Sequence, residues 1–166
     1  MSGEVRLMPM TLERCHELYA HWQNDPAIYA DVSHFQPFRY DREWVERYYA
    51  RQQAADRRYF AIMRHDAVIG EIVLKRIDWQ EKTCVLSIHL QNDHVKNRGY
   101  GTHAERLAVS YAFEQMGMRA IYADALIGNA RSRHVLEKVG FEYYKEDGVF
   151  AYYRMEKEKS SRKGEG

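Results

Sequence analysis

The sequence predicts one α+β domain built on a mixed, mostly antiparallel sheet, and three observations support this prediction. The 166 residues are enough for a single domain with a proper hydrophobic core. Three strand-like segments with short connections lie between residues 58 and 90, which favours an antiparallel meander. A glycine turn and one helical crossover then lead to another strand-like segment, which implies one parallel pair of strands.

The spacing of apolar residues gives the expected elements, because a period of two favours a strand and a spacing of three or four favours a helix. About seven strands and four to five helices result: a strand at 5–10, helices at 11–22, 28–32 and 41–55, strands at 58–63, 68–77 and 83–90, a helix at 102–116, a strand at 120–125, a helix at 129–139, and strands at 141–144 and 150–155.

Individual residues mark the limits of the N-terminal elements. Pro9 favours an edge position for the first strand, because proline cannot donate to a ladder hydrogen bond. Thr11 can cap the first helix, and Pro26 should end it and begin the short second one. The helix at 41–55 carries a largely aromatic face, formed by Trp44, Val45, Tyr48 and Tyr49.

Glycines mark the limits of the C-terminal elements. Gly117 should stop the helix at 102–116, and Gly140 should close the helix at 129–139. The turn at Asp147-Gly148 joins the last two strands as a hairpin.

Residues 33–40 form an aromatic loop between the predicted helices. Polar side chains accompany its rings, so Phe35, Phe38 and Tyr40 are candidate substrate-binding residues. Aromatic residues also serve as core, and the sequence leaves both interpretations open.

The composition excludes several classes of protein. The formal net charge is +1 and the basic residues are dispersed among acidic ones, which argues against a nucleic-acid binder. Cys15 and Cys84 lack metal-ligand spacing, and no apolar run approaches a membrane span. We therefore expect a cytoplasmic protein without a metal, a nucleic-acid partner or a membrane partner. The fold should occupy residues 1–156, and residues 157–166 should be a disordered tail.

The glycine turn at residues 96–102 has the features of an anion-binding site. Gly99 and Gly101 can take positive φ and let a ligand approach the backbone. A helix with Thr102 as N-cap and Glu105 three residues later would leave its first N–H groups unpaired. These groups and the helix dipole favour a phosphate or pyrophosphate. Positive charge at the mouth comes from Lys96 and Arg98.

Other interpretations of this turn make different demands. A Walker A loop needs Lys-Ser/Thr directly after its last glycine, where this chain has Thr102-His103. A dinucleotide fold tolerates Ala104 at the third glycine position, and Asp124 stands near the expected spacing of its acidic residue. However, the chain has only one crossover, and its flanking strands are antiparallel. A tight turn without a ligand remains open.

Two segments resemble the GNAT superfamily of acetyl-CoA-dependent N-acetyltransferases. Residues 96–101, Lys-Asn-Arg-Gly-Tyr-Gly, resemble its Q/R-x-x-G-x-G/A motif with lysine at the first position. Residues 129–141 resemble its second signature, an Asn-x-x-Ser/Ala helix that ends in Gly-Phe. Residues 5–11 are similar to the start of the RimJ/RimL branch, which acetylates ribosomal-protein N-termini and has relatives acting on other amines. The resemblance covers about residues 4–156 and implies the GNAT fold.

This resemblance implies acetyl-CoA as co-substrate and no metal. Main-chain N–H groups from Arg98 to Thr102 would hold the pyrophosphate. The pantetheine arm would run between splayed strands at 83–90 and 120–125, where it replaces a missing strand. Asn129 would bond a pantetheine amide. The cofactor-binding residues expected in this way are His89, Leu90, Lys96, Arg98, Gly99, Tyr100, Gly101, Thr102, Asn129 and Ser132.

Aminolysis of a thioester needs an oxyanion donor and an acid for the departing thiolate. The resemblance implies a main-chain N–H near Leu90 as the oxyanion donor. Many GNAT enzymes carry an acidic tyrosine seven residues after the asparagine, but Leu136 stands there. In the RimJ/RimL branch a serine three residues after the asparagine is the candidate acid, and this residue is Ser132. Alternatively, Ser132 only caps or packs in its helix.

The attacking amine also needs a base. The glutamate that members of this branch often carry before the pyrophosphate loop is replaced by Leu86. His89 and Glu71 remain as candidates, and an imidazole ordinarily titrates nearest to neutral pH. A water relay without a dedicated base is equally open.

The resemblance therefore implies an N-acetyltransferase that acetylates a primary amine by direct attack in a ternary complex. The acceptor is either a protein N-terminus or a small molecule. Two alternatives are a GNAT-fold module that binds acyl-CoA without turnover and an acyltransferase that uses a longer chain. A homodimer is also open.

Overall fold

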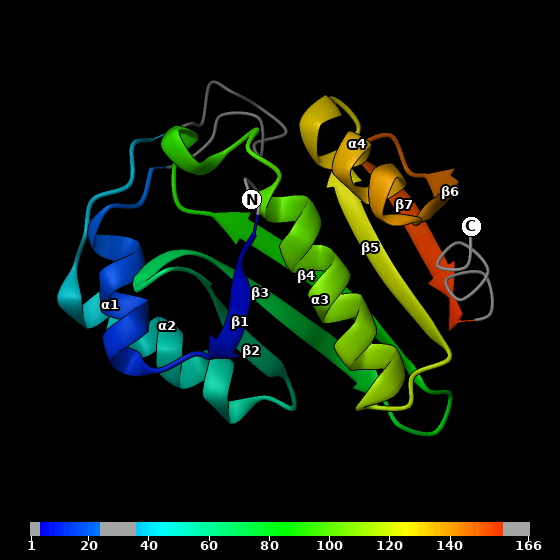
Figure 1. Ribbon diagram of the computed structural model, residues 1–166, viewed down its shortest axis with the longest axis horizontal. Coiled ribbons are helices and arrows are strands. Elements are labelled where there is room, and N and C mark those ends of the chain that lie inside the picture. The colour runs from blue at the N-terminus through cyan, green and yellow to red at the C-terminus, as the bar shows by residue number, and fades with distance from the viewer. Residues whose placement is uncertain (1–3, 24–35, 158–166) are drawn as a thin grey trace.

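The computed structural model describes residues 4–23 and 36–157. Its seven strands form one sheet in the order β1-β2-β3-β4-β5-β7-β6 (Figure 1). The elements are β1 (Arg6–Pro9), α1 (Leu12–Ala20), α2 (Arg42–Ala54), β2 (Arg58–Arg64), β3 (Ala67–Asp78), β4 (Thr83–Leu90), the short 3-10 helix η3 (Asp93–Val95), α3 (Tyr100–Glu114), β5 (Ala120–Leu126), α4 (Ala130–Val139), β6 (Glu142–Glu146) and β7 (Phe150–Glu156). The predicted fold class is confirmed. The short helix expected at 28–32 lies outside the described residues.

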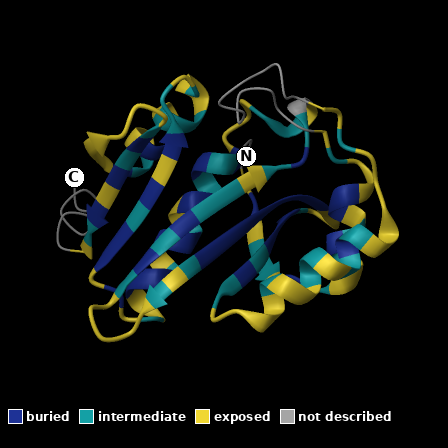
Figure 2. Cartoon of the chain, turned by 180° about the vertical axis from the view of Figure 1, so that it is seen from behind, coloured by how far each residue is buried: buried dark blue, intermediate teal, exposed yellow. Residues whose placement is uncertain are grey.

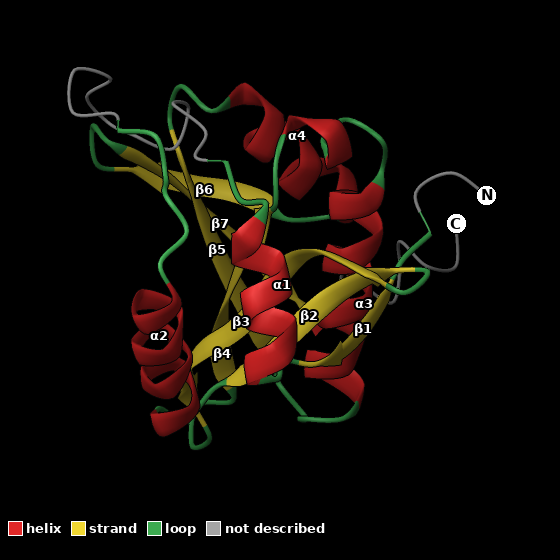
Figure 3. Cartoon of the chain, turned by 90° about the vertical axis from the view of Figure 1, so that its left-hand side faces the viewer, coloured by secondary structure: helices red, strands yellow, loops and turns green. Residues whose placement is uncertain are grey.

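The helices cover the two faces of the sheet in pairs (Figure 3). Helix α3 packs against β1, β3, β4 and β5, and α4 packs against α3, β5 and β6. Helices α1 and α2 pack together on the opposite face. Each face has its own apolar core, one centred on α3 and the other beneath α1 and α2. Within the described residues, no helix is long and apolar enough to cross a membrane.

Figure 2 shows the C-terminal half of the sheet from behind, without a helix over its strands. Helices α1 and α2 reach only the other half of this face. No described helix therefore covers the back of β4 and β5 where these strands meet.

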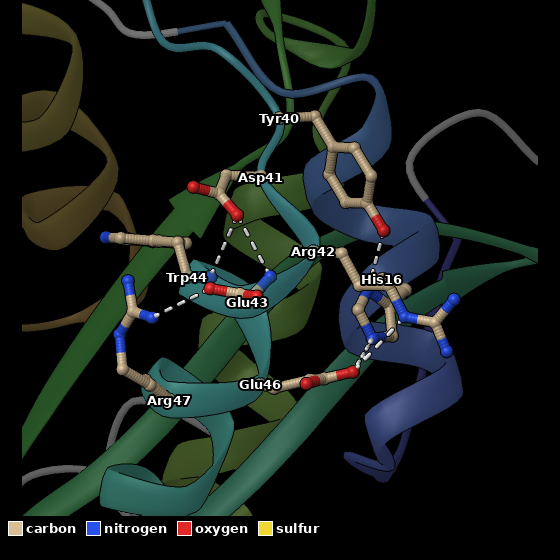
Figure 4. Close-up of polar contacts among 8 residues, drawn as sticks. All are labelled: His16, Tyr40, Asp41, Arg42, Glu43, Trp44, Glu46 and Arg47. Atoms are coloured by element: carbon tan, nitrogen blue, oxygen red, sulfur yellow. Dashed lines mark hydrogen bonds and ion pairs between the residues drawn. The ribbon is translucent and has the colours of Figure 1, made fainter.

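The N-terminal helices begin at the residues that the sequence indicates. The Thr11 side chain accepts the Arg14 N–H and caps α1, as predicted. Asp41 caps α2 by accepting the N–H groups of Glu43 and Trp44 (Figure 4). These bonds satisfy helix donors that would otherwise have no partner.

Strands β4 and β5 form the one parallel pair among the described strands, and they separate early. Pairing is limited to Thr83 with Ala120, Cys84 with Ile121, and Val85 with Tyr122. Beyond these three pairs the strands diverge, as Figure 1 shows. The predicted splay is present, and it leaves the β5-facing side of β4 without a strand partner from Leu86 onward.

The glycine turn differs from the prediction in two details. Helix α3 begins at Tyr100 with Gly99 as its N-cap, so the assignment of the cap to Thr102 is wrong. Positive φ occurs at Asn97 (60°) and Gly99 (84°), whereas Gly101 lies inside the helix. The turn therefore ends two residues earlier than expected, because the left-handed Gly99 already directs the chain into the helix.

Candidate functional site

Two adjoining cavities occupy the place where β4 and β5 separate. The first lies between the end of β4, the start of α3 and α4. The second follows the separated strands down to Lys75 and Phe150. Their shared wall residues come from β4, α3 and α4, namely Ile88, His89, Glu105, Asn129 and Ser132. The cavities therefore meet at one junction, which these five residues surround.

The N-terminus of α3 contributes Gly101 to the wall of the first cavity. The His103 N–H donates to Gly99 O over 3.1 Å, so the N–H groups before it have no acceptor inside the helix. A Cβ built on Gly101 would meet only the Leu90 Cδ1 atom, at 3.7 Å, so protein atoms leave the space beside it open. Unpaired N–H groups, the helix dipole and open space together suit a pyrophosphate.

The side chains around this turn have separate tasks. Lys96 lines the first cavity, whereas the Arg98 Nε donates to His94 O over 2.7 Å and supports the turn. Tyr100 is buried in the core, with the Arg64 guanidinium 4.8 Å from the centre of its ring. Thr102 is buried as well. Tyr100 and Thr102 therefore offer a ligand their main-chain N–H groups and not their side chains.

Helix α4 brings Asn129 and Ser132 to the junction. Asn129 caps α4, since its Oδ1 accepts the Ser132 N–H over 3.2 Å. Its Nδ2 group is the part of this side chain that can donate to a ligand. The cap is thus Asn129, and the half-buried Ser132 lies in the first turn facing both cavities. Leu136 is 2% exposed and belongs to the core, so this helix presents no phenol there.

The two candidate bases are cross-strand neighbours. Glu71 on β3 pairs directly with His89 on β4, and His89 Nδ1 lies 3.8 Å from Glu71 Oε1. The His89 side chain is 45% exposed and lines both cavities. Desolvation by the cavity walls lowers the pKa of His89, and Lys75 and Lys96 lower it further, against the opposing effect of Glu71. The imidazole is therefore neutral at neutral pH and can accept a proton.

Glu71 is a buried carboxylate held by three phenols. Tyr19 donates to its Oε1, Tyr48 donates over 2.8 Å, and Tyr59 donates to its Oε2 over 2.5 Å. Burial, followed by the charge of Glu71, raises the pKa of all three tyrosines. The phenols therefore remain donors across the working pH range, and they fix the carboxylate beside His89.

Glu105 is a site residue that sequence reasoning missed. It is 1% exposed, lines both cavities, and its Oε2 has no hydrogen-bond partner among the described residues. Burial raises the pKa of its carboxyl to about 8. The signal in the sequence was a charged residue four positions after Gly101, on the same side of the helix. Its assignment to a capping box with Thr102 is wrong, because the cap lies at Gly99.

The loop residues expected to bind substrate lie apart from the cavities. Phe35 is outside the described residues. Phe38 packs between Tyr19 and Trp44 in the core beneath α1 and α2. Tyr40 is exposed and shares a hydrogen bond of 2.7 Å with His16 of α1 (Figure 4). Neither Phe38 nor Tyr40 forms part of either cavity wall.

Two residues after α1 close the first cavity instead. Trp22 and Gln23 both line it. The Trp22 ring meets the His89 ring edge-on at 6.3 Å between centroids, and the Gln23 N–H donates to Gln91 O over 2.9 Å. No pattern in the sequence distinguished Trp22 from the apolar face of α1, to which it was assigned.

The described residues contain no group of three or more His, Cys, Asp or Glu side chains that could hold a metal ion. A separate observation identifies the family. The family model for an acetyltransferase (GNAT) domain matches residues 4–142 of the chain. The chain belongs to this GNAT acetyltransferase family.

Solved structures with the GNAT fold resemble this chain over most of its length. A probable acetyltransferase has a TM-score of 0.74 at 16% identity, covering 95% of this chain and 98% of that one. The spermidine N-acetyltransferase from Vibrio cholerae, in complex with CoA and spermine, has a TM-score of 0.75 at 16% identity, with the same coverage. At these identities the likeness shows the GNAT fold.

A third GNAT structure resembles part of the chain. The N-acetyltransferase PseH from Campylobacter jejuni, in complex with acetyl coenzyme A, has a TM-score of 0.61 at 21% identity, covering 69% of this chain and 79% of that one. Among curated protein sequences, a search found no match to this GNAT chain.

Proposed function

We propose that this GNAT domain transfers the acetyl group of acetyl-CoA to a primary amine by direct attack in a ternary complex. One observation carries the proposal: β4 and β5 separate after three residue pairs, and two adjoining cavities lie there, the first of them lined by Gly101 at the N-terminus of α3. A separated pair of strands is costly unless a ligand satisfies the exposed strand edge. The pantetheine arm of CoA is a ligand with amide groups suited to this edge.

The two adjoining cavities form one channel, and the residues that line it fit CoA along its whole length. The N–H groups at the start of α3 bind the pyrophosphate, and the open space at Gly101 admits it. The free side of β4 up to Leu90 bonds the pantetheine, and the Nδ2 of Asn129 donates to one of its carbonyl groups. The thioester then lies near the junction that His89, Ser132 and Glu105 surround.

His89 is the base in this proposal. Its imidazole is neutral at neutral pH and takes a proton from the attacking amine. The Glu71 carboxylate, fixed by its three phenols 3.8 Å away, then stabilises the imidazolium. Glu71 is thereby a positioning residue that acts through His89, because its own carboxylate is buried behind the phenols.

The other groups act on the acetyl carbonyl and the sulfur. A main-chain N–H near Leu90 donates to the oxyanion. The Ser132 hydroxyl donates a hydrogen bond to the sulfur as negative charge develops there. Both groups are held by regular elements, β4 and the first turn of α4, so their positions are fixed before the reaction.

We propose a small-molecule amine or a protein N-terminus as acceptor. The fold likeness to a spermidine N-acetyltransferase supports small amines. The similarity of residues 5–11 to the RimJ/RimL branch supports peptide N-termini. The Trp22 ring beside His89 suits a cationic acceptor in either case.

The test is release of the CoA thiol from acetyl-CoA in the presence of an amine panel containing polyamines, other small amines and peptides with free N-termini. Turnover with any of these amines supports the proposal. Calorimetric binding of CoA without turnover of any amine would instead support an acyl-CoA-binding module. Faster turnover of longer acyl-CoA thioesters would change the assigned acyl group and leave the site unchanged.

A further inference from the structure

Glu105 is the least satisfied polar group in the described part of the chain. Its Oε2 is buried without a hydrogen-bond partner, although buried polar atoms nearly always have one. The carboxyl belongs to the second turn of α3 and lines both cavities at their junction. A buried carboxyl that faces a channel without a protein partner indicates a partner in the ligand that fills the channel.

The surroundings shift the pKa values of Glu105 and His89 in opposite directions. Both residues line the same junction, Glu105 from α3 and His89 from β4. Burial raises the pKa of Glu105 to about 8 and lowers the pKa of His89. At neutral pH one is a protonated acid and the other a neutral base, and such opposite perturbations are typical of acid and base partners in catalysis.

Charged groups from several elements line one or the other of the two cavities, and His89 lines both. They are Lys75 of β3, His89 of β4, Lys96 of the turn before α3, Asp124 of β5 and Arg131 of α4. Burial is the cause of the raised pKa of Glu105, and none of these charges contributes noticeably to it. The protonated state of Glu105 therefore depends on the walls that enclose it.

We propose that Glu105 is the general acid that protonates the CoA sulfur as the thioester breaks. The proposal rests on the acetyl transfer proposed above. In this proposal the proton delivered to sulfur comes from a residue on α3. The position on α4 where many GNAT enzymes carry an acidic tyrosine is Leu136, which is buried in the core. Ser132 keeps its place as a hydrogen-bond donor to the same sulfur.

The proton and electron balance closes with these groups alone. The amine nitrogen bonds to the acetyl carbon, and an N–H proton passes to His89. The carbon–sulfur bond then breaks with its electron pair going to sulfur, and the carboxyl proton of Glu105 passes to sulfur, so CoA leaves as the thiol. Turnover leaves an imidazolium and a carboxylate, and transfer of one proton between them through solvent restores both.

The first arm of the test does not need activity. Thermal unfolding of the wild type and of Glu105→Gln is measured from pH 5 to pH 9. A buried carboxyl that is neutral in the folded protein loses stability as pH rises from its ordinary pKa towards about 8, whereas the amide does not. The melting temperature of Glu105→Gln minus that of the wild type should therefore increase as pH rises across this range. A constant difference would show that Glu105 is ionised and would overturn the proposal.

The second arm measures turnover with an accepted amine at pH 7. Glu105→Gln should lower kcat with acetyl-CoA about 10²-fold, the scale of a general acid, and leave the calorimetric Kd for CoA nearly unchanged. The control is Glu114→Gln, an exposed glutamate of the same helix, and it should match the wild type. A weaker Kd that accounts for the whole loss would instead assign Glu105 to pantetheine binding and overturn its role as acid.

The third arm changes the leaving group. An acetyl thioester of an acidic aryl thiol leaves as thiolate without protonation, so Glu105→Gln and wild type should turn it over at similar rates. An equal loss with both thioesters would overturn the proposal, because a structural role does not depend on thiol acidity. If the wild type acetylates no amine, the proposed function fails together with the acid. If the wild type acetylates an amine with acetyl-CoA and Glu105→Gln does so at the same rate, the acetyl transfer stands and only the role of Glu105 as acid fails.

Discussion

Replacement of Gly101 should affect folding and CoA binding in opposite directions. Gly101 lies inside α3 at ordinary helical φ, and a Cβ there would meet only Leu90 Cδ1 at 3.7 Å, an ordinary contact. Gly101→Ala should therefore stabilise the fold by about 0.5 to 1 kcal/mol, because alanine loses less backbone entropy on folding. Gly101→Val should stabilise the fold only about half as much as Gly101→Ala, since a β-branched residue is a poorer helix former.

The same side chains should weaken binding of CoA. The space beside Gly101 belongs to the first cavity, and the proposed pyrophosphate approaches the backbone there. We expect Gly101→Val to raise the calorimetric Kd for CoA at least about tenfold, or about 1.4 kcal/mol, with a smaller effect for alanine.

The assay is calorimetric titration of CoA together with thermal unfolding on the same preparations. Gly117→Ala is the matched control, because Gly117 has a φ of +73° and lies away from both cavities. It should destabilise the fold by about 1 kcal/mol and leave the Kd unchanged. A folded Gly101→Val with wild-type affinity would refute the placement of the pyrophosphate at the start of α3.

Four further results are expected. Ser132→Ala should reduce kcat and kcat/KM alike by one to three powers of ten, about 1.4 to 4 kcal/mol, with little change in melting temperature; unchanged kinetics would remove Ser132 from the reaction. The pH profile of kcat/KM should fall on the acid side with a midpoint below the ordinary histidine value, because the pKa of His89 is lowered and the base must be neutral; His89→Ala should abolish this limb. Asp41→Ala should cost about 1 kcal/mol of unfolding free energy through the lost α2 cap, as denaturant unfolding can measure, without effect on kcat. The stability gained by Glu105→Gln between pH 5 and 8 should have an upper limit of about 4 kcal/mol, and no gain would mean that the carboxyl is solvated.

The elements and the anion turn could be predicted from sequence because their signals are local. Apolar spacing gave the seven strands in the observed order, and Thr11 marked a helix start correctly. The N-cap of α3 was misplaced by three residues, since both Gly99 and Thr102 are acceptable caps and only the backbone of the turn decides between them.

The electrostatic part of the site could not be predicted because its partners are distant in the chain. Glu71 gathers hydroxyl groups from α1, α2 and β2, and its contact with His89 depends on the register of β3 against β4. A slip of one residue would place either side chain on the other face.

Glu105 was missed for a related reason. Its role follows from which face of α3 meets the channel, and that face is set by the true start of the helix at Tyr100. The sequence showed an acidic residue, and the fold showed that its Oε2 is buried without a hydrogen-bond partner among the described residues.

The fate of the acetyl group tests the central claim most directly. The wild-type protein is mixed with an accepted amine and acetyl-CoA that carries an isotope label in the acetyl group, and the reaction is stopped by acid within one turnover. Direct transfer in the channel predicts that the label passes from CoA to the amine and that none remains on the protein. Label bound covalently to the protein would contradict direct attack, and label that stays on CoA with every amine would contradict acetyl transfer.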